Sequence, residues 1–428
     1  MKGSRAYRAK SVKRVDWESV VRGRGTEAAN VGTDVSKREV RAVLRWADGR
    51  FERPWLVENP GEVLEFVGLL ERLRAGRELT VAMEPTGTYG DALRQALTDA
   101  GMAVMRVSPK AAHDYAEVFD GVPSQHDGKD AAVVAELSAV GKSRPWGYEP
   151  PSGWEQELAY WVDWLDAQRV QGVMWQGRLE GLLARHWPEA TQWLKLCSPT
   201  LWRTLAGYGG PAALAADPQA LAQLAAWGGV HLEEEKIRGL IESAASSVGV
   251  RQGEIDLQRV RQYAEQVLAA HREVLRSARR LRKLAEGQEV LERQGEAVGV
   301  PTACVLWVHL GDPRQYHCAA AYRKAMGLNL AERSSGEYEG RLRITKRGSA
   351  QVRRWLYFAA LRAVLAGPIK RWYLRKKAVD GDRAKRALVG VMRRLALALY
   401  YVGAAGETYD PWRLFPGASA SLPRVVMV

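Results

Sequence analysis

Residues 81–90 read VAMEPTGTYG, an apolar run that ends on one acid, Glu84, and is followed by a Pro-Thr-Gly turn. A short apolar run bounded by turn residues predicts a buried strand. A surface carboxylate needs no buried strand to deliver it, whereas a metal ion or a phosphate needs its ligands at fixed places. The run therefore predicts that Glu84 belongs to a site that binds a metal ion or a phosphate. It also predicts that further acids are positioned in the same way.

The segments around this strand predict a mixed α/β domain over residues 29–150. The stretch ANVGTDVSK is a strand that carries Asp34, and REVRAVLRWADGRFERPWLV alternates around an Asp-Gly turn, which indicates a hairpin. Helical patterns at 60–76 and 89–101 flank the Glu84 strand, then a strand and two more helices follow. Three leading strands followed by alternating helices and strands are typical of a ribonuclease-H-like fold.

Four acids converge in such a fold. Asp34 lies on the first strand, Glu84 on the fourth strand beside it, and HDGKDA adds Asp127 and Asp130 at a helix start. Their spacing of three puts the last two on one helix face. Each acid alone could be a turn or capping residue. Together they would repel one another without a cation, and hard oxygen ligands suit Mg²⁺. Two Mg²⁺ ions can stabilise the attacking and leaving oxygens of a phosphodiester.

The positive charge is concentrated near the C-terminus. The net charge is +14, and the 17 Lys/Arg against two acids between Arg341 and Arg394 give that stretch +15, which leaves −1 for the rest. Trp355 and Trp372 are among the aromatic residues interleaved with it. This pattern predicts a surface that follows nucleic-acid phosphates. The alternative is a solvated helix face.

Length and composition set broad limits. A chain of 428 residues predicts two or three domains, and three widely spaced cysteines favour a reducing cytosol over a disulfide framework. We find no apolar run near the ~18 residues of a membrane span and no signal peptide. Residues 1–28 are basic with little apolar periodicity, which predicts a flexible arm. The arm either touches nucleic acid or only aids solubility.

The motifs GTDVSK, EPTGTY and HDGKDA, in this order and spacing, resemble the RuvC-like DEDD domain of the bridge-RNA-guided transposases of bacterial insertion sequences. Residues 310–361 are similar to the C-terminal transposase domain of that family, with its Ser-Gly and with ITKRG before a basic helix. The resemblance covers nearly the whole chain apart from the N-terminal arm.

The sequence pattern and the resemblance together predict four regions, and the resemblance implies their partners. Residues 1–28 are the basic arm, 29–150 the RuvC-like DEDD domain, 151–290 a helical region with a coiled coil, and 291–428 a mainly helical, basic transposase domain. The implied activity is RNA-guided DNA recombination on donor and target DNA, with a structured guide (bridge) RNA, Mg²⁺, and a homodimer or homotetramer. The implied location is the bacterial cytoplasm, in association with the nucleoid and without a membrane.

The resemblance also implies a serine nucleophile in ERSSGEYEG. Strand exchange without ATP must keep the phosphodiester energy in a covalent link, which a serine hydroxyl can provide. The serine directly before glycine is Ser335, and Ser334 is the alternative. The acids and the serine of one active site come either from the same protomer or from two different protomers. The expected nucleic-acid contacts are Arg333, Arg341, Arg343, Lys346, Arg347, Arg353, Arg354, Arg375 and Lys376.

Residues 254–286 carry a heptad pattern with Val260, Val267 and Leu281 at one core position and Ala264 and His271 at the other. Four heptads favour a coiled coil that joins two protomers. An amphipathic helix packed within its own domain is the alternative.

Two other functions remain open from the residues alone. One is a Holliday-junction-type or ribonuclease-H-like nuclease that uses Asp34, Glu84, Asp127 and Asp130 with water. The other is a non-catalytic nucleic-acid-binding protein. Metal-dependent cleavage of DNA separates the last from the enzymes, and a covalent protein–DNA adduct separates the recombinase from the nuclease.

Overall fold

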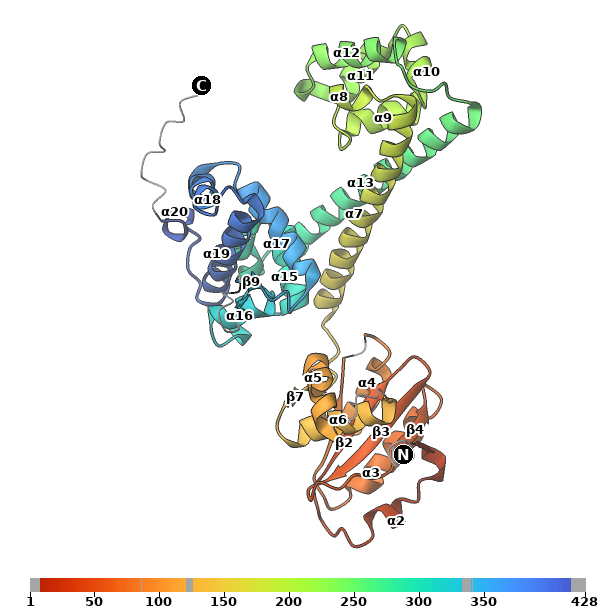
Figure 1. Cartoon of the computed structure of the whole chain (residues 1–428), viewed down its shortest axis with the longest axis vertical. Coiled ribbons are helices and arrows are strands. Elements are labelled where there is room, and N and C mark those ends of the chain that lie inside the picture. The colour runs from red at the N-terminus through yellow and green to blue at the C-terminus, as the bar shows by residue number, and fades with distance from the viewer. Residues whose placement is uncertain (1–7, 86, 121–125, 333–339, 341, 417–428) are drawn as a thin grey trace. The chain divides into compact units, whose positions relative to one another are not determined.

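The computed structural model describes residues 8–85, 87–120, 126–332, 340 and 342–416. The chain divides into two compact units, Met1–Pro150 and Pro151–Val428. Each unit has its own layers and its own hydrophobic core (Figure 1).

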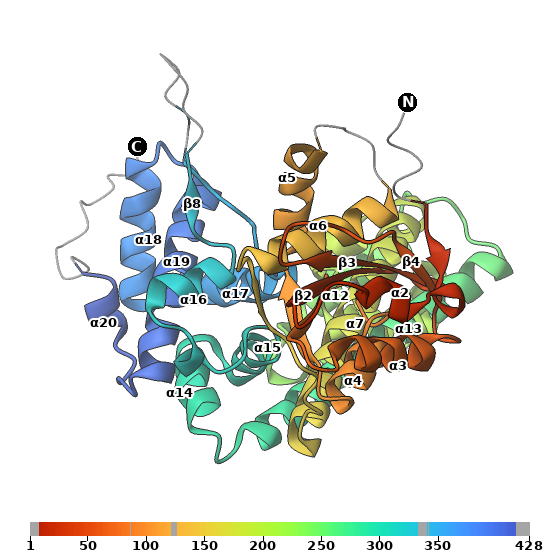
Figure 2. The ribbon, with the colours of Figure 1, turned by 90° about the horizontal axis from the view of Figure 1, so that it is seen from below.

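The N-terminal unit is a mixed sheet with helices on both faces (Figure 2). Its strands are β1 (Lys10–Ser11), β2 (Ala29–Val35), β3 (Glu39–Trp46), β4 (Trp55–Glu58), β5 (Leu79–Met83), β6 (Ala103–Val107) and β7 (Ser143–Pro145). Its helices are η1 (Val12–Arg14), α2 (Trp17–Val21), α3 (Val63–Arg74), α4 (Asp91–Asp99), α5 (Pro109–Asp120) and α6 (Asp127–Ala139).

The strand order is β1-β4-β3-β2-β5-β6-β7. Strands β2, β3 and β4 form an antiparallel meander, while β5 and β6 join β2 in parallel. Side chains alternate between the two faces: Val31 and Val81 pack with α3 and α4, whereas Ala82 packs with α5 and α6. This mixed sheet with a leading meander fits the ribonuclease-H-like fold expected from the sequence.

The stretch expected as a basic arm is partly folded. Strand β1 pairs in parallel with β4, and Val12 is buried in the core that the sheet shares with α3. The Nζ atom of Lys13 lies 2.9 Å from the Oε1 atom of Glu62. The arm expectation therefore does not hold for residues 10–21, because a few apolar side chains in a basic stretch suffice to anchor it to the sheet.

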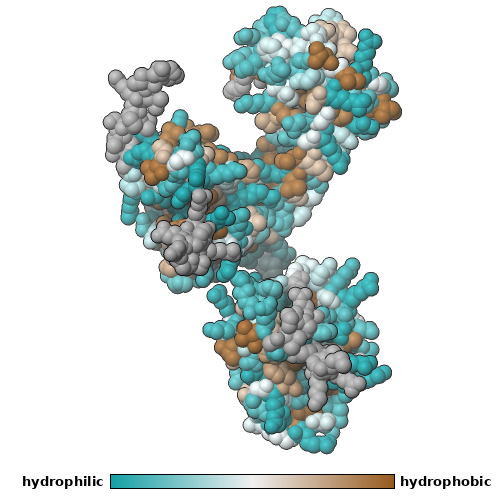
Figure 3. Space-filling view, viewed as in Figure 1, coloured by the Kyte–Doolittle hydropathy of each residue, from teal (hydrophilic) through white to brown (hydrophobic). Residues whose placement is uncertain are grey.

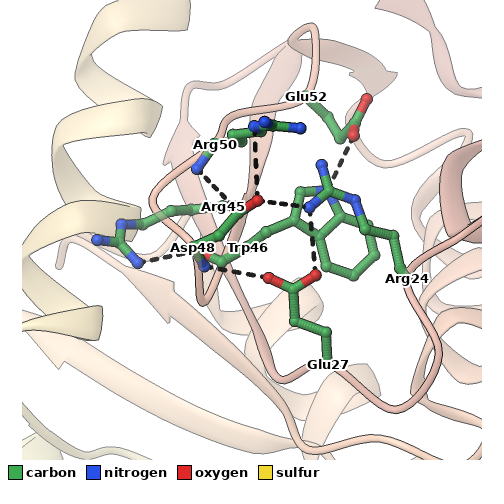
Figure 4. Close-up of polar contacts among 7 residues, drawn as sticks. All are labelled: Arg24, Glu27, Arg45, Trp46, Asp48, Arg50 and Glu52. Carbon is green, nitrogen blue, oxygen red and sulfur yellow. Dashed lines mark hydrogen bonds and ion pairs between the residues drawn. The ribbon is translucent and has the colours of Figure 1, made fainter.

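The next residues are tied to the β3–β4 connection by polar contacts (Figure 4). The Arg24 guanidinium donates to Asp48 at 2.8 Å and to Glu27 at 3.2 Å, and it lies over the Trp46 ring. The backbone N–H of Asp48 donates to Glu27 at 3.0 Å. These contacts hold the segment that precedes β2 against the Asp-Gly turn that the sequence predicted.

The C-terminal unit is mainly helical. Its helices are α7 (Gly153–His186), α8 (Ala190–Trp193), α9 (Pro199–Tyr208), α10 (Pro211–Ala216), α11 (Ala220–Gly228), η2 (Gly229–His231), α12 (Glu234–Ala245), α13 (Glu254–Ala285), α14 (Glu289–Val298), α15 (Val300–Leu310), η3 (Pro313–Gln315), α16 (Ala319–Ala325), α17 (Ala350–Ala363), α18 (Gly367–Val379), α19 (Ala384–Ala404) and α20 (Pro411–Leu414). Strands β8 (Leu330–Ala331) and β9 (Arg343–Ile344) pair antiparallel.

The long helices α7 and α13 pack against each other (Figure 1). The heptad residues Val260, Ala264 and Val267 are buried and share a core with Leu179 and Leu183 of α7. The heptad seam of α13 is thus covered within the chain. A coiled coil between protomers is not confirmed, because the same apolar spacing can be covered by a helix of the same chain or by a helix of another protomer.

Helix α19 is the centre of the C-terminal core. Val391, Leu395 and Leu399 are fully buried against α14, α16 and α17. By length and composition α19 could cross a membrane, but 56% of its apolar window is buried inside the unit. A mostly buried helix of this kind is typical of the core of a soluble protein.

Candidate metal centre and nucleic-acid surface

Helix α6 approaches strand β2 closely at one glycine. A Cβ atom placed on Gly32 would lie 2.1 Å from the backbone oxygen of Ala131 and 2.3 Å from the backbone nitrogen of Ala135. No residue with a side chain fits this contact without moving the helix. Gly32 therefore lets the part of α6 around Ala131 and Ala135 lie directly on β2.

This packing brings three acids together. Asp34 lies near the end of β2, and Asp127 and Asp130 occupy the first turn of α6. One carboxylate oxygen from each lies within 4.8 Å of the others. The first turn of α6 thus brings Asp127 and Asp130 close to Asp34, while a shared metal-binding role of the three acids stays a prediction.

Glu84 stands at the end of the neighbouring strand, and it is not one of the three acids whose carboxylate oxygens lie within 4.8 Å of one another. It directly follows Met83, the last residue of β5, and Met83 pairs with Thr33 of β2 in parallel register. The Thr33 hydroxyl donates to the backbone oxygen of Ala82 at 3.2 Å, which ties the two strands together just before the acids. Glu84 lies near enough to Asp34 and Asp130 for their charges to act on it.

Burial and crowding make these carboxylates hard to ionise. Burial raises the pKa of Asp34 to about 6, with further increases from the charges of Asp127 and Asp130. Burial also raises the pKa of Glu84 to about 7, helped by Asp34 and Asp130. The pKa of Asp130 is raised by burial and by Asp127. A cation placed among them would remove the penalty.

The acids fit a divalent metal ion. All four offer hard carboxylate oxygens, the ligands that Mg²⁺ and similar ions prefer. Asp34, Asp127 and Asp130 already lie close enough to share an ion, and burial, followed by the charges of neighbouring carboxylates, raises the pKa values of Asp34 and Asp130. The residues present could therefore hold a divalent cation at the ends of β2 and β5.

Arg41 is a site residue that the sequence analysis missed. It pairs directly with Asp34 across the β2–β3 ladder, and its Nε atom lies 3.9 Å from the Oδ2 atom of Asp127. Arg41 also lowers the pKa of Asp34 against the dominant upward effect of burial. The sequence signal for this pairing was the tight turn after Val35. Residues at equal distances from such a turn pair across an antiparallel ladder, so residue 34 pairs with residue 41.

Lys129 is a second residue that was missed. Between Asp127 and Asp130, it is almost fully buried, and its Nζ atom lies 2.6 Å from the Oδ1 atom of Asp120 at the end of α5. A buried lysine requires such a partner. This ion pair fixes the start of α6 to α5 and so helps to set the position of the two aspartates.

The expected serine and part of the expected basic surface cannot be placed. Ser334, Ser335, Arg333 and Arg341 lie outside the described residues. Exposed basic side chains flank this stretch on its C-terminal side: Arg343 is on β9, and Lys346 and Arg347 follow it.

The remaining predicted contacts are engaged within the chain. Arg353 donates to the backbone oxygen of Gly348 at 2.8 Å, and Arg354 forms an ion pair with Asp166 of α7. Arg375 donates to the backbone oxygen of Pro416, and the Nζ atom of Lys376 lies 2.7 Å from Asp380. These four have structural contacts, whereas Arg343, Lys346 and Arg347 are exposed.

Comparisons with known proteins match two regions of the chain. Residues 31–188 match the DEDD transposase domain of IS110 elements, and residues 293–375 match the Transposase IS116/IS110/IS902 family. Two regions of the chain are thus similar to transposase domains of the IS110 family. An uncharacterised 43.6 kDa protein of insertion element IS110 from Streptomyces coelicolor is 24% identical over 319 residues, which are 73% of this chain and 78% of that protein.

The IS110-family domains imply an enzyme that acts on DNA in transposition. The DEDD domain contains all four acids of the candidate metal centre, and it suggests the use of a divalent metal. The second domain contains the β8–β9 pair and helix α17.

Proposed function

We propose that this transposase is an RNA-guided DNA recombinase, which cuts and rejoins strands through a covalent phosphoserine intermediate at Ser335. Asp34, Glu84, Asp127 and Asp130 hold Mg²⁺ in this proposal. The observation that carries the enzymatic part is the convergence of the acids at the ends of β2, β5 and α6.

The four acids do two things in this proposal. They place the metal at the scissile phosphate. Their ionised carboxylates also repel one another in a partly buried place, and the metal would neutralise this negative charge. When bound, Mg²⁺ would stabilise negative charge on the phosphate oxygens and lower the pKa of a hydroxyl beside it. Arg41 lies beside Asp34 and Asp127, where it restrains them before substrate arrives.

The proposed covalent step conserves the energy of the DNA backbone. The Ser335 oxygen forms a bond to phosphorus while the bond between phosphorus and one DNA oxygen breaks. The serine proton leaves to water, and the departing DNA oxygen takes up a proton to become a free hydroxyl. Attack by a DNA hydroxyl then reverses these changes and releases the serine.

The test is adduct formation on a suicide DNA substrate whose cut end diffuses away. The Ser335→Ala variant should bind DNA normally and form no phosphoserine adduct, while Ser334→Ala should keep substantial activity. If only Ser334→Ala loses the adduct, the nucleophile moves by one residue. If both variants still recombine DNA, the covalent-serine proposal fails.

A metal-dependent nuclease is the second candidate, because the DEDD acids alone could direct water at a phosphodiester. It predicts metal-dependent DNA cleavage without any covalent adduct. The same suicide substrate therefore separates the two enzymes. A protein that binds DNA but never cleaves it with Mg²⁺ or Mn²⁺ present would exclude both.

The guide RNA in this proposal rests on the resemblance of GTDVSK, EPTGTY and HDGKDA to bridge-RNA-guided transposases. The guide sets the target by base pairing, so the protein needs only sequence-independent backbone contacts. The exposed Arg343, Lys346 and Arg347 suit such contacts. Omission of the RNA encoded beside this reading frame should abolish recombination at the matching target.

The homo-oligomer in this proposal is supported by an exposed apolar face on α7. Val170, Val173 and Met174 are 53%, 69% and 43% exposed, and helical spacing places Gly177 and Gly181 on the same face. Figure 3 shows hydrophobic residues along the stalk formed by α7 and α13. A second copy could cover this face.

The oligomer can be tested by light scattering during gel filtration. Val173→Glu should shift the protein towards the monomer, because it places a charge in the proposed contact. Val379→Glu, at an 81% exposed position on α18, is the matched control and should leave the mass unchanged. An unchanged mass for Val173→Glu would place the contact elsewhere.

A further inference from the structure

Two arginines meet in the C-terminal unit without a counter-charge. Arg323 on α16 and Arg393 on α19 are half-buried, and the two helices pack together. The Nε atom of each is enclosed and has no hydrogen-bond partner. Burial and the neighbouring charge of Arg323 both lower the pKa of Arg393.

Neither guanidinium has an acidic partner in the described part of the chain. No ion pair, side-chain hydrogen bond or ring contact joins either of them to a described residue. Only their Nε atoms are fully enclosed without a partner, so the terminal nitrogens reach the surface. Two positively charged guanidinium groups are therefore close together and partly shielded from solvent. Their terminal nitrogens remain able to donate hydrogen bonds to a ligand.

Other half-buried arginines show what a purely structural role looks like. Arg45 forms a two-pronged contact with Glu136, and Arg24 pairs with Asp48. Such contacts repay the loss of water around the guanidinium. Arg323 and Arg393 have no such compensation, and their mutual repulsion costs stability in the free protein.

The position of the pair relates it to the expected serine. Helix α16 ends at Ala325 and leads through Gly327 directly into β8, which enters the stretch that contains Ser335 (Figure 2). The Arg353 guanidinium fixes this connection, because it donates to the backbone oxygens of Met326 and Gly348. Arg323 thus lies on the helix that leads into the β8–β9 pair, and Arg393 lies on the helix packed against it.

We propose that Arg323 and Arg393 form a binding site for one phosphodiester group of a DNA strand. The inference rests on the proposed function, since it deepens the DNA contacts of the same C-terminal domain. Guanidinium donors form short, charge-assisted hydrogen bonds to phosphate oxygens, and a shared anion would replace repulsion with attraction. DNA is the committed ligand because the domain that contains Arg323 matches a DNA transposase family.

Stability without DNA is the first test, because it separates a binding role from a structural one. Arg393→Gln should raise the thermal midpoint of the DNA-free protein, since it removes a half-buried charge from beside Arg323. A structural role predicts a lower midpoint. A fall in the midpoint, with Lys324→Gln unchanged, would overturn the proposal.

DNA binding is the second test. The double variant Arg323→Gln, Arg393→Gln should bind a duplex about tenfold more weakly, the scale of one charge-assisted contact. Its log–log salt slope should be smaller by ~0.9, as for one phosphate contact. Lys324→Gln removes an exposed charge from the same helix and should have a smaller effect. Equal effects of the double and control variants would exclude a built site.

Single-stranded RNA serves as the parallel probe. A loss of affinity confined to RNA would overturn DNA as the ligand. Binding is measured without metal and without reaction, so the result does not depend on cleavage. If the wild type forms no adduct but the double variant still loses DNA affinity, the proposed chemistry fails and the site stands.

Chemical protection keeps the proposal testable if the double variant does not fold. Phenylglyoxal modifies accessible guanidiniums, and mass spectrometry can follow Arg323 and Arg393 in the wild-type chain. A duplex of DNA should slow the modification of both. Equal rates with and without DNA, under conditions in which the DNA is bound, would overturn the site.

Discussion

The absent Cβ of Gly32 lets the backbone oxygen of Ala131 approach β2 to a distance that no side chain would permit. Because Ala131 directly follows Asp130, this contact sets the height of the acids of α6 above Asp34. The candidate metal centre therefore depends on a residue that carries no functional group.

Gly32→Ala should destabilise the N-terminal unit and weaken metal binding together. The added methyl group must push α6 from the strand, and overpacking of this kind typically costs about 1–3 kcal/mol. Thermal unfolding and calorimetric titration with Mn²⁺ measure the two effects. Gly68→Ala on α3 is the control, because a Cβ there meets nothing within 4 Å and alanine favours the helix. Normal Mn²⁺ affinity in a folded Gly32→Ala protein would show that α6 can shift without cost to the site.

The metal-free protein should lose stability as the pH rises from about 4 to about 7. The pKa values of Asp34 and Glu84 are raised to about 6 and about 7, so the folded state holds protons that the unfolded state has released. Stability falls with pH wherever the folded state binds more protons. The thermal midpoint of the full chain in EDTA measures the effect, and saturating Mg²⁺ should reverse it near pH 7.

Asp34→Asn provides the check on this pH dependence. In EDTA at pH 8 the variant should unfold at a higher temperature than the wild type, because one crowded charge is gone. The difference should shrink at pH 4, where Asp34 is protonated in the folded state. With Mg²⁺ the order should reverse, since the variant has lost a ligand. A variant that is less stable than the wild type in EDTA at pH 8 would contradict the proposed crowding.

Asp130→Ala should abolish recombination while leaving DNA affinity within about twofold. A metal ligand acts on the transition state, and loss of one such stabilising group costs about 100-fold or more in rate. Recombination in cells and filter binding in vitro measure the two properties. Glu117→Ala, an exposed acid on α5, is the matched control. Wild-type recombination by Asp130→Ala would remove this acid from the site.

Joint replacement of Arg343, Lys346 and Arg347 by glutamine should weaken DNA and RNA binding without unfolding the protein. Each lost phosphate contact should reduce the log–log salt slope by ~0.7–0.9. These residues are a sharper test than Arg353 and Arg354, which also have structural contacts.

The control for the basic surface is a triple variant with the same loss of charge. Lys195, Arg251 and Lys283 are exposed and lie outside the basic stretch, so their replacement by glutamine should change affinity less. A salt slope that stays at the wild-type value in the first triple variant would mean that its residues form only a solvated face.

The clustering of Asp34, Asp127 and Asp130 could be predicted because its signals are local, and metal binding by the cluster stays a prediction. Glu84 ends an apolar run, and the three-residue spacing of Asp127 and Asp130 defines a helix face without knowledge of the fold. Arg41 and the Lys129–Asp120 pair were not predicted, because their roles depend on strand register and on packing between two helices. Gly32 could be read as important only once α6 was in place.

The helical region shows the opposite limit of sequence interpretation. The heptads of α13 predicted an apolar seam correctly, and Val260, Val267 and Leu281 are buried. The pattern does not encode whose helix covers the seam. In the structure, α7 of the same chain covers the seam. The exposed apolar residues lie instead on α7, at Val170 and Val173.

The junction at Pro150–Pro151 has a practical consequence for protein engineering. Strand β7 ends at Pro145, α7 begins at Gly153 with its own capping box, and each hydrophobic cluster of described residues lies on one side of the junction. The chain could therefore be produced as two polypeptides, with the acids on one and the basic stretch on the other. Fused to a drug-inducible dimerising pair, such fragments would place the timing of DNA rearrangement under the control of the experimenter.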